Sequence, residues 1–437
     1  MRSRRLLLVV GLGLACSYPN PAYEDSGPVG GSDASQGTSV GGSSEGSTSL
    51  PPADGSSTLW GATTTTTMGE ASEELGESGP PPSGCDAPPP PPGVVCQQPD
   101  PVDLSRECDP RPVFVADLDG DALGDVIVGC DQGPLLVLHG EPGGLGAPQT
   151  IGEAGPAPVD IAVAQLDGEH GVDIVVVDDV LGDGVRVFFD EGDGTYTLES
   201  YDPGGRPASV AVGAWYENPL PDLVIADPIG GQIVRMESMG PRVYQVGFPL
   251  SILAGHPHDV ALGQLDGEGG IDMAIASQTA AKLTVIFNTG NGGESQPLEF
   301  PDAGTVLPNR LILDDLEQDG SLDILYTRSG VSGLKVFRGD GSGAFVAQAT
   351  SYGMEVRGLG GGDFDADGHR DTVLADRAGN ALIFVMRLGG EVMDTVTVPL
   401  DGSPWSIATG MIDGDAMTDV VVSIEGSNEL VVALSGS

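Results

Sequence analysis

Short loops rich in aspartate are the segments of this chain best suited to chemistry, and metal binding is the chemistry they suggest. Each loop spans nine residues, with oxygen-bearing side chains at positions 1, 3, 5 and 9 and a backbone carbonyl available at position 7. Calcium takes about six to eight oxygen ligands from carboxylates, carbonyls and water, and glycine permits the sharp bend that brings them together. A loop of this pattern therefore predicts a calcium site.

Three loops carry four carboxylates each and give the strongest prediction of calcium. Four such charges within nine residues repel one another strongly unless a cation lies between them. The open alternative is that the aspartates only cap turns by accepting hydrogen bonds from nearby backbone amides. The predicted ligands, with the carbonyl given by the fourth residue of each set, are Asp117, Asp119, Asp121, Leu123 and Asp125 in the first loop, Asp315, Glu317, Asp319, Ser321 and Asp323 in the fifth, and Asp363, Asp365, Asp367, His369 and Asp371 in the sixth.

The remaining loops depart from the full pattern. The second and fourth begin with Gln165 and Gln264 in place of the first carboxylate, and the seventh begins with Met411. The third keeps only Asp222 among these positions, so no metal is predicted there. Weaker metal binding is predicted for Asp167, Glu169 and Asp173, for Asp266, Glu268 and Asp272, and for Asp413, Asp415 and Asp419.

The loops recur with a regular period. The aspartates at loop position 9, named anchor aspartates below, are separated by 48, 49, 50, 51, 48 and 48 residues. A short apolar, β-favouring run follows each anchor, and every unit but the last has room for four short strands. This predicts an all-β fold, a seven-bladed β-propeller of four-stranded blades, with an open β-solenoid as the alternative. The anchors are Asp125, Asp173, Asp222, Asp272, Asp323, Asp371 and Asp419.

The repeats resemble a known family. The likeness rests on the Asp-x-Asp-Gly-Asp-x-x-x-Asp loop at 117–125, on the apolar strand after it, and on turns such as Gly192-Asp193-Gly194 before Tyr196. These features are similar to the FG-GAP/VCBS repeats, which include the propeller of integrin α subunits, over about residues 112–437. The resemblance implies calcium in the loop between the first and second strands of a blade, with partners on other loops. The Phe-Gly…Gly-Ala-Pro signature of integrins is absent, so the likeness is to the bacterial branch.

The first residues predict export. Arg2, Arg4 and Arg5 precede the apolar stretch Leu6–Ala15, which is too short to span a bilayer but suits a signal peptide at residues 1–15. Leu14-Ala15-Cys16 resembles a bacterial lipobox, in which Cys16 would be lipidated and would attach the protein to a membrane. Gly13 departs from that pattern, because a bulky aliphatic residue is usual there. The alternative is plain signal cleavage with a spare thiol.

A low-complexity acidic linker is predicted at residues 16–111, ahead of the propeller at 112–437. The segment is rich in Gly, Ser, Thr and Pro and has too few apolar residues to offset the entropy of ordering it. No Lys or Arg occurs between Arg5 and Arg106, so its acidic groups repel one another. As a flexible coil of roughly 80 residues it would reach on the order of 50 Å.

Four cysteines remain after Cys16 is set aside for lipid. An exported chain with an even number of cysteines favours two disulfides. Cys108 precedes the first strand of blade one and Cys130 ends the second, so this pair is preferred, which leaves Cys85 to pair with Cys96. Zinc is the alternative, disfavoured because no Cys-x-x-Cys spacing occurs and the compartment is oxidising.

The seventh unit has no room for a fourth strand, because only three residues follow Leu430–Leu434. An unpaired sheet edge there would promote aggregation, so a strand from elsewhere in the chain is expected to cover it. The only β-favouring candidate upstream of the repeats is Gly93–Gln97. We therefore predict that Val94 and Val95 pair antiparallel with Leu430–Leu434 and close the ring.

The net charge and the sparse catalytic motifs reduce the range of possible functions. With 64 acidic and 18 basic residues the net charge is −46, which argues against nucleic acid as a partner. Candidates for catalysis are sparse: His256 and His258 more readily form a surface loop, and Trp215 and Trp405 more readily belong to the blade core than to a sugar-binding surface. No catalytic residue is predicted, and the protein is expected not to be an enzyme.

We therefore expect an exported, lipid-anchored, calcium-stabilised propeller that displays a binding surface for a protein or glycan partner. Its expected location is the bacterial cell envelope, at the outer membrane or the cell surface. Two alternatives stay open, because a fold does not determine a function. One is a carbohydrate-active propeller enzyme, a lyase or a hydrolase, and the other is a purely structural envelope component.

Overall fold

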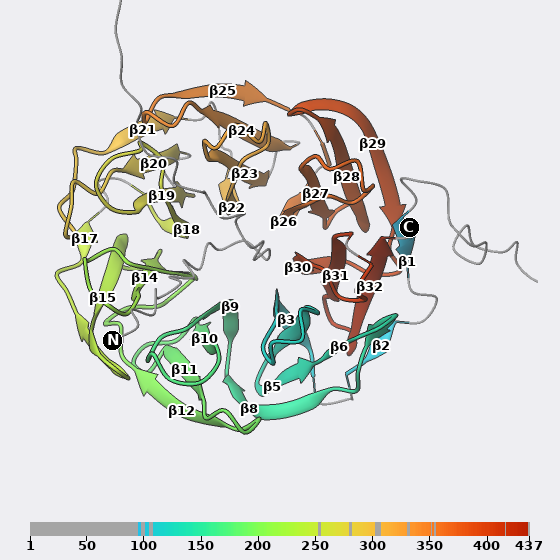
Figure 1. The fold of residues 1–437 in the computed structure, drawn as a ribbon, viewed down its shortest axis with the longest axis horizontal. Coiled ribbons are helices and arrows are strands. Elements are labelled where there is room, and N and C mark those ends of the chain that lie inside the picture. The colour runs from blue at the N-terminus through green and yellow to red at the C-terminus, as the bar shows by residue number, and fades with distance from the viewer. Residues whose placement is uncertain are drawn as a thin grey trace, which may run out of the picture. The chain divides into compact units, whose positions relative to one another are not determined.

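Seven antiparallel sheets stand around a common axis as the blades of a β-propeller (Figure 1). The computed structural model describes residues 95–97, 101–104, 108–251, 255–278, 282–301, 307–329, 333–350, 352–353, 355–415 and 417–435. Within these ranges the regular structure is entirely β-strand. The predicted seven-bladed propeller of four-stranded blades is therefore confirmed, and the alternative of an open solenoid is wrong.

Blades one to three follow the chain from the inner strand outward. Blade one contains β3 (Pro110–Ala116), β4 (Asp125–Cys130), β5 (Gly133–Leu138) and β8 (Gln149–Gly155), with the hairpin β6 (Gly140–Glu141) and β7 (Gly144–Leu145) between the last two. Blade two contains β9 (Pro158–Ala164), β10 (Asp173–Asp178), β11 (Val185–Asp190) and β12 (Tyr196–Tyr201). Blade three contains β13 (Ser209–Gly213), β14 (Asp222–Asp227), β15 (Gln232–Gly240) and β16 (Val243–Val246), and β17 (Leu250–Ser251) also pairs with β15.

Blades four to six have the same order. Blade four contains β18 (Pro257–Gly263), β19 (Asp272–Ser277), β20 (Lys282–Ile286) and β21 (Leu298–Pro301). Blade five contains β22 (Leu307–Asp314), β23 (Asp323–Ser329), β24 (Leu334–Gly339) and β25 (Phe345–Ala349). Blade six contains β26 (Val356–Gly362), β27 (Asp371–Asp376), β28 (Ala381–Leu388) and β29 (Glu391–Pro399).

Blade seven joins the two ends of the described chain. It contains β30 (Pro404–Gly410), β31 (Asp419–Ile424) and β32 (Glu429–Ser435), and β1 (Val95–Gln97) adds a fourth strand antiparallel to β32 (Figure 1). Val95 pairs with Ser435 and Gln97 with Ala433, so the predicted closing strand is present but extends past Val95 to Gln97. Val94 lies outside the described residues. A second short strand, β2 (Val102–Asp103), also pairs with β32.

The core lies between neighbouring blades and is built from the second strands. Their apolar runs after the anchors, such as Val126–Val128 in β4, are buried on both faces because each blade packs against two others. Cys108 and Cys130 form a disulfide that ties the segment before β3 to the end of β4, which is the pairing expected from neighbouring strands. Cys96 lies in β1, whereas Cys85 and Cys16 lie outside the described residues.

Candidate functional site

The acidic loops connect the first and second strands of their blades, for example between β3 and β4 in blade one. Their tight path depends on left-handed backbone at two positions. In the sixth loop Ala366 has φ of 59° and Gly368 has φ of 82°, and the first loop repeats this at Gly120 with 81° and Ala122 with 75°. Glycine adopts this conformation without steric cost, so one glycine at either position makes the turn accessible.

The anchor aspartates share one structural role in all seven blades. Each begins the second strand and is buried, and its two carboxylate oxygens accept backbone N–H groups from two different segments. One donor is in the loop and the other is near the end of the third strand. The loop donors are Leu118, Leu166, Tyr216, Leu265, Leu316, Phe364 and Ile412, and the strand donors are Gly140, Asp190, Ser238, Asn288, Gly339, Arg387 and Ser435.

The pKa values of the anchors are high because their carboxylates are buried. Burial raises the pKa of Asp371 and of Asp419 to about 7, and neighbouring loop carboxylates contribute to the rise. It raises the pKa of Asp222 to about 6, although the third loop lacks the other acids. A cation bound beside an anchor would favour the charged carboxylate and counteract this rise.

The sixth loop brings three carboxylates together. One oxygen from each of Asp363, Asp365 and Asp371 lies within 4.8 Å of the others. Asp363 accepts the N–H of Gly368 through Oδ2 at 2.9 Å, but its Oδ1 is buried and has no hydrogen-bond partner. A buried carboxylate oxygen without a partner is costly. The donor set, oxygen ligands only, fits calcium, and the orphaned oxygen is where a cation would relieve the cost.

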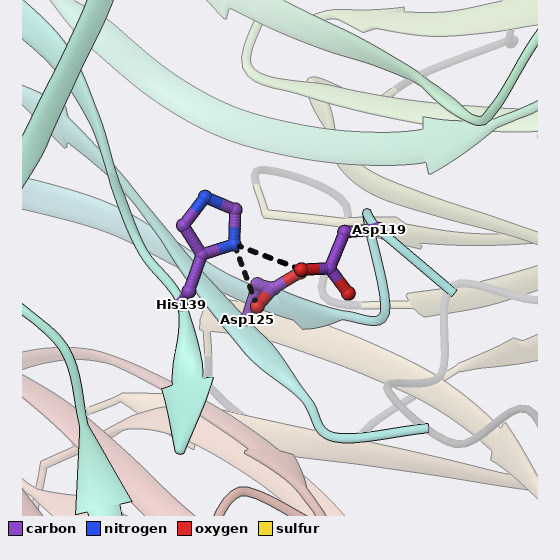
Figure 2. Close-up of side chains that lie close together, drawn as sticks. All are labelled: Asp119, Asp125 and His139. Carbon is purple, nitrogen blue, oxygen red and sulfur yellow. Dashed lines mark hydrogen bonds and ion pairs between the residues drawn. The ribbon is translucent and has the colours of Figure 1, made fainter. Parts of the chain in front are cut away.

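The first loop gathers three carboxylates and also lies beside a histidine. Oxygens of Asp117, Asp119 and Asp121 lie within 4.8 Å of one another. Figure 2 shows His139, at the end of the third strand, facing the loop: its Nδ1 is 3.1 Å from Oδ1 of Asp125 and 3.7 Å from Oδ2 of Asp119. Sequence reasoning missed His139, because no motif links it to a loop 14 residues upstream.

The fifth and seventh loops differ from the predicted ranking. In the seventh, oxygens of Asp413, Asp415 and Asp419 lie within 4.8 Å of one another, as in the sixth, although Met411 replaces the first ligand. The fifth loop does not form such a cluster among the described residues. Its Glu317 forms an ion pair with Arg338, which comes from β24 of the same blade. The protein thus supplies a cation of its own to one predicted ligand of the fifth loop.

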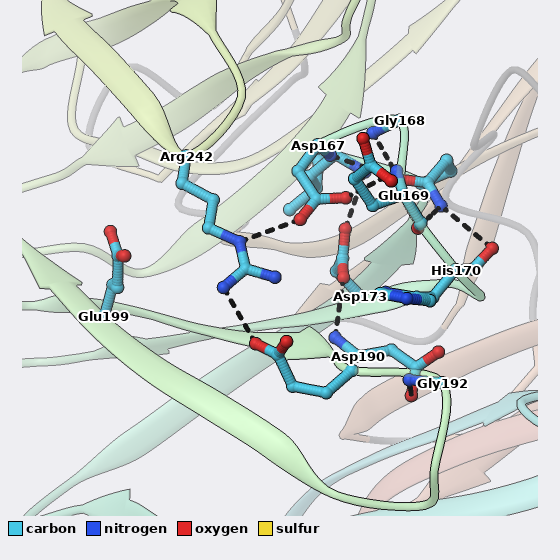
Figure 3. A network of polar contacts seen from close by, with 12 residues as sticks. Asp167, Gly168, Glu169, His170, Asp173, Asp190, Gly192, Glu199 and Arg242 are labelled. Carbon is cyan, nitrogen blue, oxygen red and sulfur yellow. Dashed lines mark hydrogen bonds and ion pairs between the residues drawn. The ribbon is translucent and has the colours of Figure 1, made fainter.

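The second and fourth loops are occupied by their glutamines. Gln264 accepts two loop N–H groups through Oε1, and its Nε2 donates to the carbonyls of Glu268 and Gly270. Gln165 makes the equivalent contacts in the second loop. Figure 3 shows that Arg242, from the turn between β15 and β16, also pairs with Asp167 of the second loop, with Nε 2.8 Å from Oδ2.

Inner strands of all seven blades line a central cavity of about 110 Å³, which a polar network crosses. Nη2 of Arg310 in blade five lies 3.1 Å from Oδ1 of Asp160 in blade two, and its Nη1 lies 3.8 Å from Oδ1 of Asp259 in blade four. Ser209 donates to Asp259 at 2.5 Å. The same carboxylates accept N–H groups of the next blade, at Val210 and Leu311. This network links four blades across the axis.

The histidines and tryptophans considered in the sequence as possible site residues mainly contact the rest of the fold. The expected surface loop is wrong for His258, which is half-buried in the inner strand β18 with its Nδ1 3.2 Å from the carbonyl of Asn309, whereas His256 is exposed just before that strand. Trp215 is fully buried in the core between blades three and four. Trp405 is half-buried between two guanidinium groups, those of Arg111 at 4.5 Å and Arg357 at 4.8 Å from the ring centroid. The expected place in the core is therefore confirmed for Trp215, whereas Trp405 contacts guanidinium groups of the two neighbouring blades outside the core.

Comparisons with known proteins support the fold. Neither a family model nor a curated protein sequence matches this chain. Among solved structures, virginiamycin B lyase from Staphylococcus aureus, in a catalytically inactive form with quinupristin, matches with a TM-score of 0.52 at 12% identity, covering 77% of this chain and 98% of that one. A structure of BBS1N in complex with ARL6DN matches with a TM-score of 0.55 at 13% identity, covering 78% of this chain and 96% of that one.

A lectin from Agrocybe aegerita, described as recognising non-reducing terminal N-acetylglucosamine, matches with a TM-score of 0.47 at 16% identity, over 71% of this chain and 84% of that one. At such identities the likeness shows a shared propeller fold and nothing finer. Because a fold does not determine a function, this likeness does not decide whether this chain is catalytic. In the described part of the chain, no helix is long and apolar enough to cross a lipid bilayer.

Proposed function

We propose that this protein is a lipid-anchored, exported propeller of the FG-GAP/VCBS type, in which calcium stabilises the acidic loops and the ring displays a surface that binds a protein or glycan partner without catalysing a reaction. The observation that carries the calcium proposal is the buried, unpartnered Oδ1 of Asp363, in a loop where three carboxylates converge. Three carboxylates also converge in the first and seventh loops, from different loop positions. A chain of net charge −46 gains further from each divalent cation, because binding reduces its self-repulsion.

The central network supports a role in binding rather than catalysis. In propellers the axial cavity offers a natural place for a small substrate, but here Arg310 spans it through its pairs with Asp160 and Asp259. The charged groups in the cavity, Arg310, Asp160 and Asp259, already form ion pairs with one another and would have to give these up to act on a substrate. A partner is therefore expected on the outer loops and edges of the ring, where a large surface is available.

Calcium binding is tested by isothermal titration of the chelated full chain, followed by thermal melting with and without calcium. Heat of binding and a higher melting temperature are expected for the wild type. Asp363→Asn keeps the size of the side chain and removes its charge, so it should weaken one site, while the same change at the exposed Asp401 should not. No heat and no thermal shift would contradict the calcium proposal.

The proposed lipidation of Cys16 and the proposed binding partner need separate tests. Palmitate labelling should tag the wild type but not Cys16→Ser, and labelling of both would show that Cys16 is not the lipid site.

A glycan array and a pull-down from bacterial envelope extracts, each with calcium and with chelator, should yield a defined ligand that is retained only with calcium. Depolymerisation of an array polysaccharide by the protein would instead favour the enzyme alternative.

A further inference from the structure

The glutamines that head the second and fourth loops point into the loop. In the fourth loop Nε2 of Gln264 donates to the carbonyl of Glu268 at 3.2 Å and to that of Gly270 at 3.0 Å. Its Oε1 accepts the N–H groups of Asp266 at 3.2 Å and Gly267 at 2.8 Å. One amide thus uses both donors and its acceptor within a single loop, and the reverse orientation would set donors against donors.

The second loop repeats this arrangement independently. Nε2 of Gln165 donates to the carbonyls of Glu169 and Gly171, and Oε1 accepts from Asp167 at 3.1 Å and Gly168 at 2.7 Å. The carbonyls at loop positions 5 and 7 receive the amide donors in both blades. Position 7 is the carbonyl that the loop pattern offers to a cation.

Loops headed by aspartate have no such donor. Asp117 accepts N–H groups from Gly120 at 2.7 Å and Ala122 at 3.0 Å, and Asp315 accepts from Asp319 at 3.0 Å and Gly320 at 2.8 Å. A carboxylate can accept these bonds as the glutamine oxygen does, but it has no N–H for the carbonyls on the other side of the loop. In these loops no side chain at position 1 donates to the carbonyls, which are left to water or to a cation.

We propose that Gln165 and Gln264 take the place of the cation in their loops, so that a glutamine at loop position 1 lets its blade do without calcium. Glutamine supplies two N–H donors to the carbonyls and removes one negative charge, and both changes lower the gain from a cation. In the second loop Arg242 adds a fixed positive charge beside Asp167. The second and fourth loops therefore stay closed without metal. The inference deepens the proposed calcium binding, and the expected change in the number of bound calcium ions rests on that proposal.

The test replaces the amide by an isosteric carboxylate in the full chain. Gln264→Glu removes the two donors and adds a ligand, so calorimetric titration should count one more calcium ion per chain than in the wild type. Its melting temperature in chelator should fall, and calcium should restore it. Gln348→Glu, an exposed glutamine in β25, is the matched control for the added charge and should change neither quantity.

A second pair of variants tests the converse in case Gln264→Glu folds poorly. Asp363→Gln should lose one calcium ion, yet it should melt higher in chelator than Asp363→Ala, because the amide closes the sixth loop. Equal melting of these two variants, or an unchanged count in a folded Gln264→Glu, would overturn the inference. A wild type that binds no calcium overturns the proposed function, and the melting temperatures in chelator then decide the role of the glutamines without it.

Discussion

The third and sixth loops keep the same anchor with the same two kinds of backbone contact, but they differ in the loop side chains around it. Asp222 accepts the N–H groups of Tyr216 and Ser238, both at 2.8 Å, and Asp371 accepts those of Phe364 at 3.2 Å and Arg387 at 2.7 Å. The sixth loop adds carboxylates at positions 1, 3 and 5, whereas the third has none at these positions. A blade can therefore lose the acids of its loop and still keep its anchor.

This difference separates two roles that the sequence pattern merges. The anchor is a bridge between backbone segments, needed in every blade, so its regular spacing reports the architecture of the ring. The acids at positions 1, 3 and 5 are exposed or half-buried in the first loop and can vary from blade to blade. If the loops bind calcium as proposed, metal content is set loop by loop, whereas the anchor contacts are common to all seven blades.

The comparison between the third and sixth loops presumes that the ring is closed. Removing the N-terminal strands tests the closure, and it has the largest effect on stability that we expect. A chain beginning at Arg111 lacks β1, β2 and Cys108, so it should melt well below a chain beginning at Pro88 and should aggregate more. Loss of the disulfide alone costs about 3 kcal/mol in the chain-entropy account. Equal melting and solubility of the two chains would show that blade seven is stable with three strands.

Removing the anchor of the third loop tests its role without metal. Asp222→Ala leaves the buried N–H groups of Tyr216 and Ser238 without an acceptor, and we expect a loss of about 3 kcal/mol in the free energy of unfolding. Urea unfolding should give the same loss in calcium and in chelator. A loss that appears only with calcium would mean that the third loop binds metal after all.

Calcium should stabilise the chain through the acidic loops only. At a hundredfold excess over Kd, each site adds about 2.7 kcal/mol to the free energy of unfolding. Asp367→Ala in the sixth loop should reduce the calcium-induced rise in melting temperature, whereas Asn218→Ala in the third loop should leave that rise unchanged. Equal reduction by both variants would remove the distinction between the loops.

A graded effect of pH is expected in chelator. The pKa of Asp222 is about 6 and that of Asp371 about 7 in the folded chain, against an ordinary value of 3.8. Protonation therefore favours the folded state, and this stabilisation, complete below the ordinary pKa, is lost as pH rises through 6 to 7. Melting in about 0.5 M NaCl, which screens general repulsion, should fall between about pH 5 and pH 8. Calcium should narrow the fall, and melting that rises with pH would contradict the prediction.

The sequence predicts the frame well because the frame is periodic. The spacing of the anchors and the apolar runs after them indicate seven blades, and the missing strand after Leu430–Leu434 points to a closing strand near Val95. The sequence does not predict β2, because a strand of two residues has no periodic pattern. Its pairing with β32 also places part of the predicted linker in blade seven.

The loops are less predictable, because their chemistry depends on residues far away in the chain. Four carboxylates made the fifth loop a strong candidate, but the pairing of Glu317 with Arg338 follows only from how β24 returns beside the loop. Arg242 reaches Asp167 from 75 residues downstream in the next blade. In the sequence, glutamine at position 1 keeps an oxygen and loses a charge, which predicts weaker metal binding. Only the geometry shows that its amide also donates to the loop carbonyls.

The closure of blade seven also decides how the protein would carry a mechanical load. Any pull on the chain ahead of Val95 enters the fold at β1, the outermost strand of the sheet, which is held to β32 by only three residue pairs. Such a load would peel β1 and then β2 from the edge before it reached a blade core. The next obstacles are Leu104, which is buried in the core between blades one and seven, and the disulfide that fixes Cys108 to Cys130 at the end of a buried strand. A pull on the chain ahead of Val95 would thus detach β1 and β2 from blade seven while leaving the other six blades folded.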